Sequence, residues 1–273
     1  MKNISYTLKH DLCTGCGVCK GACRKSAISI NANKGNFRPI VDETKCNQCG
    51  LCIKACPGVG IDIVCMANEL FPNAMHQDRM VGPYEKSFIG YSNNFDIRYH
   101  SASGGMVSSF LIWLLENNKI DGAVVTRFDK SNPLLVKTFI ATKREEIIAA
   151  RSSKYAPVTM DMVAQDINEA TGSRYVIVGI PCHIQGMRKL MAIDKKLREK
   201  ICGLFAIYCS SGRSFYLTEH VFRERGINPN HLSYFQYRDE GCLGSMVVKG
   251  KDGEEHKELF QSYYHPLRSF FYS

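Results

Sequence analysis

The sequence predicts a small cysteine-rich α+β domain followed by a larger α/β domain with a mixed sheet. Three observations lead to this fold class. Eight of the 13 cysteines fall within residues 13–56, in two similar runs. From about residue 86 onward, apolar strand patterns alternate with helix patterns, which is the order typical of an α/β domain. The length of 273 residues is enough for two such unequal domains.

The two cysteine runs share one spacing. "CTGCGVCKGAC" (13–23) and "CNQCGLCIKAC" (46–56) both have gaps of two, two and three residues. This spacing matches the bacterial ferredoxin run, in which three close thiolates bind one 4Fe-4S cluster and the fourth cysteine ligates the other cluster. The repeat therefore predicts two clusters with crossed ligands. The predicted metal ligands are Cys13, Cys16, Cys19 and Cys56 for one cluster and Cys46, Cys49, Cys52 and Cys23 for the other.

A pair of zinc knuckles is the alternative interpretation of these cysteines. Zinc sites usually combine two CxxC pairs separated by a longer span, whereas each run here holds four cysteines within eleven residues. The first run departs from the ferredoxin pattern because Arg24 stands where a proline is expected. The segment between the runs predicts a hairpin, with strands at 26–30 and 37–41. Neither feature removes a ligand, so the iron–sulfur interpretation is preferred.

The second half of the chain predicts an α/β domain over residues 86–273, joined to a first domain over 1–65. Residues 66–85 contain two prolines and little periodicity, and we interpret them as a linker. The predicted strands are 120–128, 135–142, 175–180 and 202–210. The predicted helices are 103–119, with Ser103 as N-cap, 182–201 and 214–226.

Two turns of this domain are candidate ligand sites. "SASGG" (101–105) precedes a helix, where small residues let an anion approach free amides, although a plain N-cap is the alternative. "GIPCH" (179–183) lies between a buried strand and a helix, where open α/β sheets bind ligands. Pro181 suits the first helical turn, and Cys182 at a helix start is expected to have a lowered pKa. A third stretch, "RSSKYAPV" (151–158), is by itself typical of a solvated turn.

Composition bears on partners and location. The formal charge of +9 suits nucleic acid or anionic cofactors, but the basic residues are scattered and thiolates bound to iron would lower the charge. We therefore expect no nucleic-acid partner. The first residues lack a signal peptide's apolar run, and the longest apolar run, 106–115, is about half of a membrane span. The sequence favours a cytoplasmic protein without a membrane span.

These turns and their neighbours together resemble the coenzyme F420 hydrogenase/dehydrogenase beta subunit family. The segments that carry the resemblance, in chain order, are "SASGGMVSSFLIWLLENNKIDGAVV", "SSKYAPV", "VIVGIPCHIQGMRKL", "AIYCSSGRS" and "YFQYRDEGCLGSMVV". They extend over nearly all of residues 86–250. The fold class that the resemblance implies is an α+β ferredoxin-like dicluster domain followed by an α/β flavin-binding domain with a mixed sheet.

The resemblance also implies cofactors, partners and site residues. It implies FAD, two 4Fe-4S clusters, a redox partner protein or subunit, and a hydride donor such as the deazaflavin coenzyme F420. By position, the residues implied to contact the flavin are Ser103, Gly104, Gly105, Ser153, Lys154, Tyr155, Pro181 and Cys182. Cys209 is expected near this pocket. Relatives typically continue beyond Ser273 into another cysteine-containing stretch, so we expect a C-terminally truncated domain.

The functional hypothesis is an iron–sulfur flavoprotein oxidoreductase, or the electron-input subunit of one. The first alternative is a ferredoxin-type electron carrier whose docking domain lacks flavin and catalytic activity. The second alternative is a nucleic-acid-binding protein with zinc knuckles. The isolated cysteines Cys65, Cys202 and Cys242 are expected to be small buried hydrophobic side chains.

Overall fold

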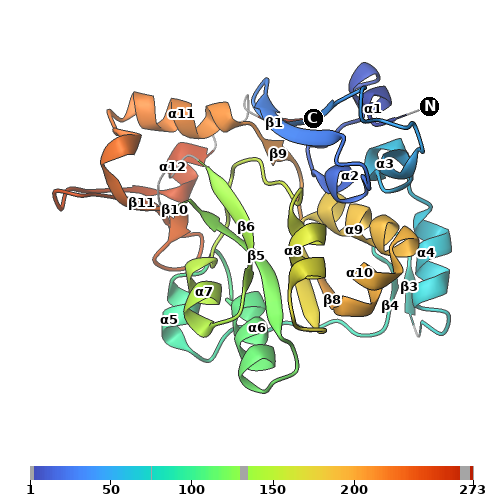
Figure 1. Cartoon of the computed structure of the whole chain (residues 1–273). Helices are drawn as coiled ribbons and strands as arrows, with labels where there is room; N and C mark the ends of the chain where they lie inside the picture. Colours follow the sequence, from blue (N-terminus) through green and yellow to red (C-terminus); the bar gives the residue numbers. More distant parts are fainter. Residues whose placement is uncertain (1–2, 75, 130–134, 265–270, 273) are drawn as a thin grey trace.

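A computed structural model describes residues 3–74, 76–129, 135–264 and 271–272 of the chain (Figure 1). The cysteine-rich domain contains α1 (Ser5–Lys9), α2 (Val18–Gly21), β1 (Ile28–Asn33), β2 (Asn36–Val41), α3 (Leu51–Lys54) and the 3-10 turn η1 (Pro57–Val59). The antiparallel pairing of β1 with β2 confirms the predicted hairpin. Its strands are longer than predicted because Lys34 and Gly35, both with positive φ, turn the chain within two residues.

The segment interpreted as a linker contains regular structure. It includes most of α4 (Ile63–Leu70) and the short hairpin of β3 (His76–Asp78) and β4 (Gly82–Tyr84). The Asp62 side chain caps α4 by accepting a hydrogen bond from the amide of Cys65 at 2.8 Å. No residue of α4 is buried, so this helix adds little to either core.

The central sheet of the second domain has the strand order β6–β5–β7–β8. Its strands are β5 (Gly122–Phe128), β6 (Val136–Ala141), β7 (Tyr175–Gly179) and β8 (Ile201–Ala206). β5 pairs with β6 antiparallel, and β5, β7 and β8 pair in parallel, which confirms the predicted mixed sheet. The apolar strands β5 and β7 lie at the centre of the sheet, where both faces are covered.

Helices surround this sheet, and two of them differ from the predicted boundaries. The helices are α5 (Phe95–Tyr99), α6 (Met106–Glu116), α7 (Arg144–Ala149), α8 (Val163–Glu169), α9 (Pro181–Ile193) and α10 (Lys195–Lys200). The single helix predicted over 182–201 is wrong, because Asp194 has extended backbone and its carboxylate caps a new helix at the Leu197 amide. The predicted N-cap Ser103 is also wrong, since Gly105, with φ of 73°, holds that position.

The last part of the chain forms a second layer. It comprises β9 (Gly212–Arg213), α11 (Phe215–Glu224), η2 (Pro229–His231), β10 (Leu232–Asp239), β11 (Ser245–Gly250), β12 (Glu255–Leu259), α12 (Phe260–Tyr264) and β13 (Phe271–Tyr272). β10, β11 and β12 make an antiparallel sheet. Its buried face packs on α11 through an aromatic core that includes Phe222, Phe235 and Tyr237.

The two domains share one hydrophobic core. Val18, Ala22 and Ala55 of the cysteine-rich domain belong to the same buried cluster as Ile184 and Met187 of α9. Figure 1 shows α2 and α3 beside α9. The cysteine-rich domain is therefore docked on the α/β domain by apolar burial, the main favourable term in such interfaces.

The three isolated cysteines lie at the surface. Cys65, Cys202 and Cys242 are exposed, so their predicted burial is wrong: each lies at a helix, strand or turn surface. Of the described helices, none combines the length and apolarity that crossing a bilayer requires.

Candidate functional site

The eight predicted ligands line two cavities. A cavity of about 240 Å³ is lined by Cys23, Cys46, Cys49 and Cys52, which we call the outer cysteine set. A smaller cavity is lined by Cys13, Cys16, Cys19 and Cys56, the inner cysteine set. Each cavity draws three cysteines from one run and the fourth from the other, which is the grouping that the spacing predicts. Four thiol donors around one cavity suit the ligand requirement of a 4Fe-4S cluster.

Two equivalent glycines shape these cavities. Gly17 and Gly50 each precede a short helix with φ of 76° and 75°, a conformation that glycine adopts without steric cost. The turn directs backbone amides toward sulfur, and the Val18 amide bonds the Cys16 thiol. Amide hydrogen bonds to sulfur stabilise the reduced, more negative state of a cluster. The geometry of these turns and the four thiols of each set therefore both fit a bound cluster.

Burial opposes ionisation of the inner thiols. It raises the pKa of Cys16 to about 12, while the Val18 amide acts in the opposite direction. Burial also raises the pKa of Cys19 and of Cys56. A bound cation compensates for this cost, because a thiol that coordinates a metal is deprotonated. Burial thus disfavours free thiolates in the inner set, and a bound cluster would have to supply the positive charge that stabilises them.

The inner set packs directly against the α/β domain. The Met160 amide donates to the Cys16 carbonyl at 2.8 Å, and Cys182 of α9 lies close enough to Cys16 to interact electrostatically. Gly186 of α9 faces Val18, where an added methyl group would come within 3.0 Å. The absence of a side chain at Gly186 therefore lets α9 approach the first cysteine run.

Lys189 of α9 also reaches this region. Its Nζ donates to the carbonyls of Cys56 and Gly60, both at 2.6 Å, and its charge lowers the pKa of the Cys56 thiol against the larger effect of burial. The α/β domain thereby places a positive charge beside the inner set. The sequence does not reveal this contact, because Lys189 lies 133 residues from Cys56 and only the folded chain brings them together.

We expect Lys189→Met to lower the reduction potential of the inner cluster. A nearby cation favours the reduced form, which carries one more negative charge. The measurement is an anaerobic redox titration followed by electron paramagnetic resonance, with Lys196→Met on the exposed surface of α10 as the control. Equal potentials in the wild type and the Lys189→Met variant would contradict the assignment of this charge to the inner cluster.

The implied flavin turns lie at one edge of the central sheet. α6 runs back to the start of β5, and α8 runs back to the start of β7. The residues before these helices, 101–105 and 151–162, therefore lie near the carboxyl ends of the parallel strands, as do the residues that follow β7. Ligands of open α/β sheets bind at this edge.

The 101–105 turn is packed on the preceding segment of chain. The Ser92 amide donates to the Gly104 carbonyl at 2.7 Å, and a methyl group at Gly104 would come within 2.9 Å of the Gly90 carbonyl. Gly104 and Gly105 are thus required by the fold itself. Ser103 is exposed and is the member of this turn with a side chain open to a ligand.

Lys154 and Tyr155 point into the protein. The Lys154 Nζ donates to the carbonyls of Ala150, Arg151 and Ser152, and burial lowers the pKa of Lys154 to about 7. The Tyr155 ring packs on Tyr237, Phe260 and Tyr264. These two residues shape the 151–155 turn from inside, while the neighbouring Ser153 is half-buried.

The turn after β7 lies beside the inner cysteine set. Pro181 is the first residue of α9, which confirms its predicted place in the first helical turn. The pKa of Cys182 is raised, so the predicted lowering is wrong: burial outweighs the hydrogen bonds at the helix start. Thr14 and Cys209 are its polar neighbours. His183 is buried, which lowers its pKa to about 4, and its Nε2 contacts the Val158 carbonyl at 3.1 Å.

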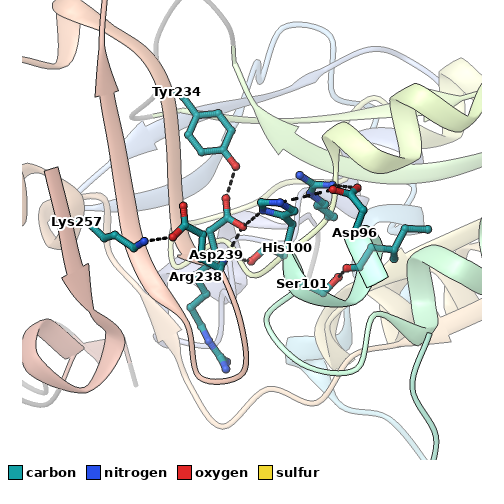
Figure 2. Close-up of polar contacts among 11 residues, drawn as sticks. Asp96, His100, Ser101, Tyr234, Arg238, Asp239 and Lys257 are labelled. Carbon is teal, nitrogen blue, oxygen red and sulfur yellow. Dashed lines mark hydrogen bonds and ion pairs between the residues drawn. The ribbon is translucent and has the colours of Figure 1, made fainter. Parts of the chain in front are cut away.

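A polar network that the sequence does not predict joins the 101–105 and 151–155 turns (Figure 2). His100, directly before the 101–105 turn, lies 2.6 Å from the buried carboxylate of Asp239, to which Tyr234 also donates. Arg238 donates to the Ala102 carbonyl, and its own carbonyl accepts from Ser152. The end of β10 therefore holds the 101–105 and 151–155 turns together. No local signal in the sequence pairs residue 100 with residue 239.

Comparisons with protein families agree with this architecture. Residues 87–165 match the model for the N-terminal part of the coenzyme F420 hydrogenase/dehydrogenase beta subunit, and residues 172–267 match the model for its C terminus. Residues 12–60 match a 4Fe-4S dicluster domain, which contains both cysteine runs.

Comparisons with individual proteins give distant relatives. A coenzyme F420-dependent sulfite reductase of Methanocaldococcus jannaschii is 29% identical over 267 residues, which cover 92% of this chain and 38% of the relative. A coenzyme F420 hydrogenase subunit beta of Methanococcus voltae is 27% identical over 172 residues, which cover 62% of this chain and 58% of the relative. The chain therefore spans less than two thirds of either protein.

A solved structure shows a similar fold. A chain of the F420-reducing [NiFe] hydrogenase complex from Methanosarcina barkeri superposes with a TM-score of 0.51 and 17% sequence identity. The match covers 72% of this chain and 67% of that chain.

Proposed function

This chain belongs to the coenzyme F420 hydrogenase/dehydrogenase beta subunit family and carries a 4Fe-4S dicluster domain, and on that basis we propose that it is an iron–sulfur flavoprotein oxidoreductase or the electron-input subunit of one. In this proposal electrons move between a hydride donor, FAD and two 4Fe-4S clusters. The donor is the deazaflavin coenzyme F420 or a similar compound, which agrees with the names of the relatives.

One observation supports this proposal above the others. The inner cysteine set packs on residue 160 and on the start of α9, at the sheet edge that also holds the implied flavin turns. A cofactor at this edge would therefore lie beside the inner cluster. Bound FAD would accept a hydride as an electron pair and release single electrons, which is how iron–sulfur clusters carry them.

The residues of this edge have separable roles in the proposal. Ser103, with the amides at the start of α6, would bind the flavin phosphates. Ser153, Pro181 and Cys182 would line the pocket. Lys154 would hold the 151–155 turn by its three carbonyl contacts, and Tyr155 would anchor that turn in the aromatic core.

The structure also favours a second candidate at one point. Lys154 and Tyr155 are implied flavin contacts, but both already have partners within the protein. The Lys154 Nζ donates to a backbone carbonyl, and the Tyr155 ring packs on Phe260. A ferredoxin-type carrier with a docking domain that lacks flavin would show the same contacts. Flavin content distinguishes the two candidates.

We expect anaerobically purified protein to release FAD on acid extraction, in an amount comparable to the protein. The extract is quantified by flavin fluorescence, with iron and acid-labile sulfide measured on the same sample. The same purification of a Ser103→Trp variant is the control, because a bulky side chain at this exposed turn should reduce flavin but leave the distant clusters intact. Iron and sulfide without FAD, and no FAD uptake on reconstitution, would favour the carrier.

A further inference from the structure

The two cysteine sets differ in how they meet solvent, and this difference identifies a docking surface. We propose that an acidic iron–sulfur electron-carrier protein docks at the mouth of the outer cavity, on the basic side chains of Arg24 and Lys25, and exchanges electrons with the outer cluster. The inference rests on the two clusters of the proposed function but is independent of the flavin. In this proposal the inner cluster exchanges electrons with a cofactor of the α/β domain, and the outer cluster exchanges electrons with a separate protein.

Burial sets the order of the two clusters. In the outer set, Cys49 is exposed, Cys23 and Cys46 are half-buried, and Cys52 is buried. In the inner set, Cys16, Cys19 and Cys56 are buried, with 8%, 7% and 8% of their surface exposed, and Cys13 is half-buried. Electron transfer slows steeply with distance, so a carrier in solution reaches the outer cluster more readily. Met160 and α9 contact the first cysteine run, so the α/β domain lies nearer to the inner cluster than to the outer cluster.

The charges at the mouth select the carrier. Arg24 and Lys25 line the outer cavity, and both are exposed. Of the nearby acidic residues, Asp42 pairs with Lys45 at 3.0 Å, whereas Glu43 accepts from the neutral Asn3 at 3.1 Å and keeps its negative charge, which the two cations outweigh. A cluster held by four thiolates is negative and would repel an acidic protein. The two cations offset this repulsion and favour a negative partner surface.

The departure of the first run from the ferredoxin pattern fits this interpretation. In the second run the corresponding residue is Pro57, which lies against Gly186 of α9 inside the domain interface. Arg24 occupies the equivalent position of the first run, but it faces the outer cavity and solvent. A proline at this solvent-facing position would contribute nothing to the interface, whereas an arginine contributes charge. Each encounter transfers one electron between the cluster of the carrier and the outer cluster, and no bond forms.

The test is the rate of electron exchange with a small acidic 2[4Fe-4S] ferredoxin as probe, measured by anaerobic stopped flow. We expect the Arg24→Glu, Lys25→Glu double variant to react about tenfold more slowly or worse at low ionic strength, and to lose the wild type's decrease in rate with salt. Because these substitutions place negative charge beside the outer cluster, its reduction potential is measured for each variant and the rates are compared at equal driving force, while iron and sulfide content should stay unchanged. The control is Lys196→Glu with Arg198→Glu on α10, which changes the net charge equally at exposed sites.

Two outcomes would overturn the proposal. One is a wild-type rate for the Arg24→Glu, Lys25→Glu variant at low salt. The other is an equal loss of rate in the α10 control, which would assign the effect to net charge. Because the probe exchanges electrons with a cluster directly, a protein without FAD would refute the flavin function and still give a valid result here.

Discussion

Replacing Cys56 with alanine is expected to remove about half of the iron and acid-labile sulfide, and the lost cluster is the one bound by the first cysteine run. Cys56 belongs to the second run in the sequence but lines the inner cavity with Cys13, Cys16 and Cys19. A cubane that loses one of four thiolate ligands exposes an iron atom and is prone to disassembly. Iron and sulfide analysis of the purified variant measures the loss.

Double variants distinguish crossed from uncrossed ligands. If Cys13 and Cys56 serve the same cluster, replacing both should remove no more iron than replacing Cys56 alone. Replacing Cys46 together with Cys56 should remove nearly all of it, because each cavity then lacks a ligand. The reverse pattern would show that each run binds its own cluster. Cys65, which is exposed and lies outside both cavities, provides the matched control, and Cys65→Ala should retain all of the iron.

The parts of the structure that could be predicted depend on short-range patterns. The hairpin follows from apolar segments on either side of a short polar stretch that contains glycine, and the grouping of the cysteines follows from their spacing. The strands of the central sheet are short apolar runs bounded by turn residues, so their positions were predictable within a few residues. The mixed pairing follows from the order of the elements, because helices precede β7 and β8, as parallel pairing requires, whereas no predicted helix separates β5 from β6.

The parts that could not be predicted depend on contacts between distant segments or on competing local effects. The charge of Lys189 beside Cys56 and the pairing of His100 with Asp239 arise only when the domains fold together. The break at Asp194 lies in a helical pattern, where the capping of Leu197 outweighs helix continuation. The raised pKa of Cys182 reflects its burial, which the helix start alone does not reveal.

The docking of the two domains can be tested at Gly17, for which the repeat supplies an internal control. Gly17 and Gly50 occupy equivalent positions and have nearly the same φ, so an alanine at either position costs about 1–2 kcal/mol of backbone strain. Their surroundings differ. A methyl group at Gly17 would lie 1.9 Å from the Thr159 Oγ1 and 3.0 Å from the Asp161 amide, whereas nothing lies within 4 Å of one at Gly50.

Gly17→Ala is therefore expected to reduce stability by about 1–3 kcal/mol more than Gly50→Ala, the usual range for overpacking a fitted interface. Urea unfolding, followed by the fluorescence of the single tryptophan, Trp113, measures the difference through the α/β domain. Adding Thr159→Ala to Gly17→Ala removes the closest contact and should restore part of the lost stability. Equal midpoints for the two glycine variants would mean that the first cysteine run does not pack on residues 159–161. A rescue by Thr159→Ala would instead locate the strain at the contact that brings the inner cluster to the sheet edge, which the proposed electron path requires.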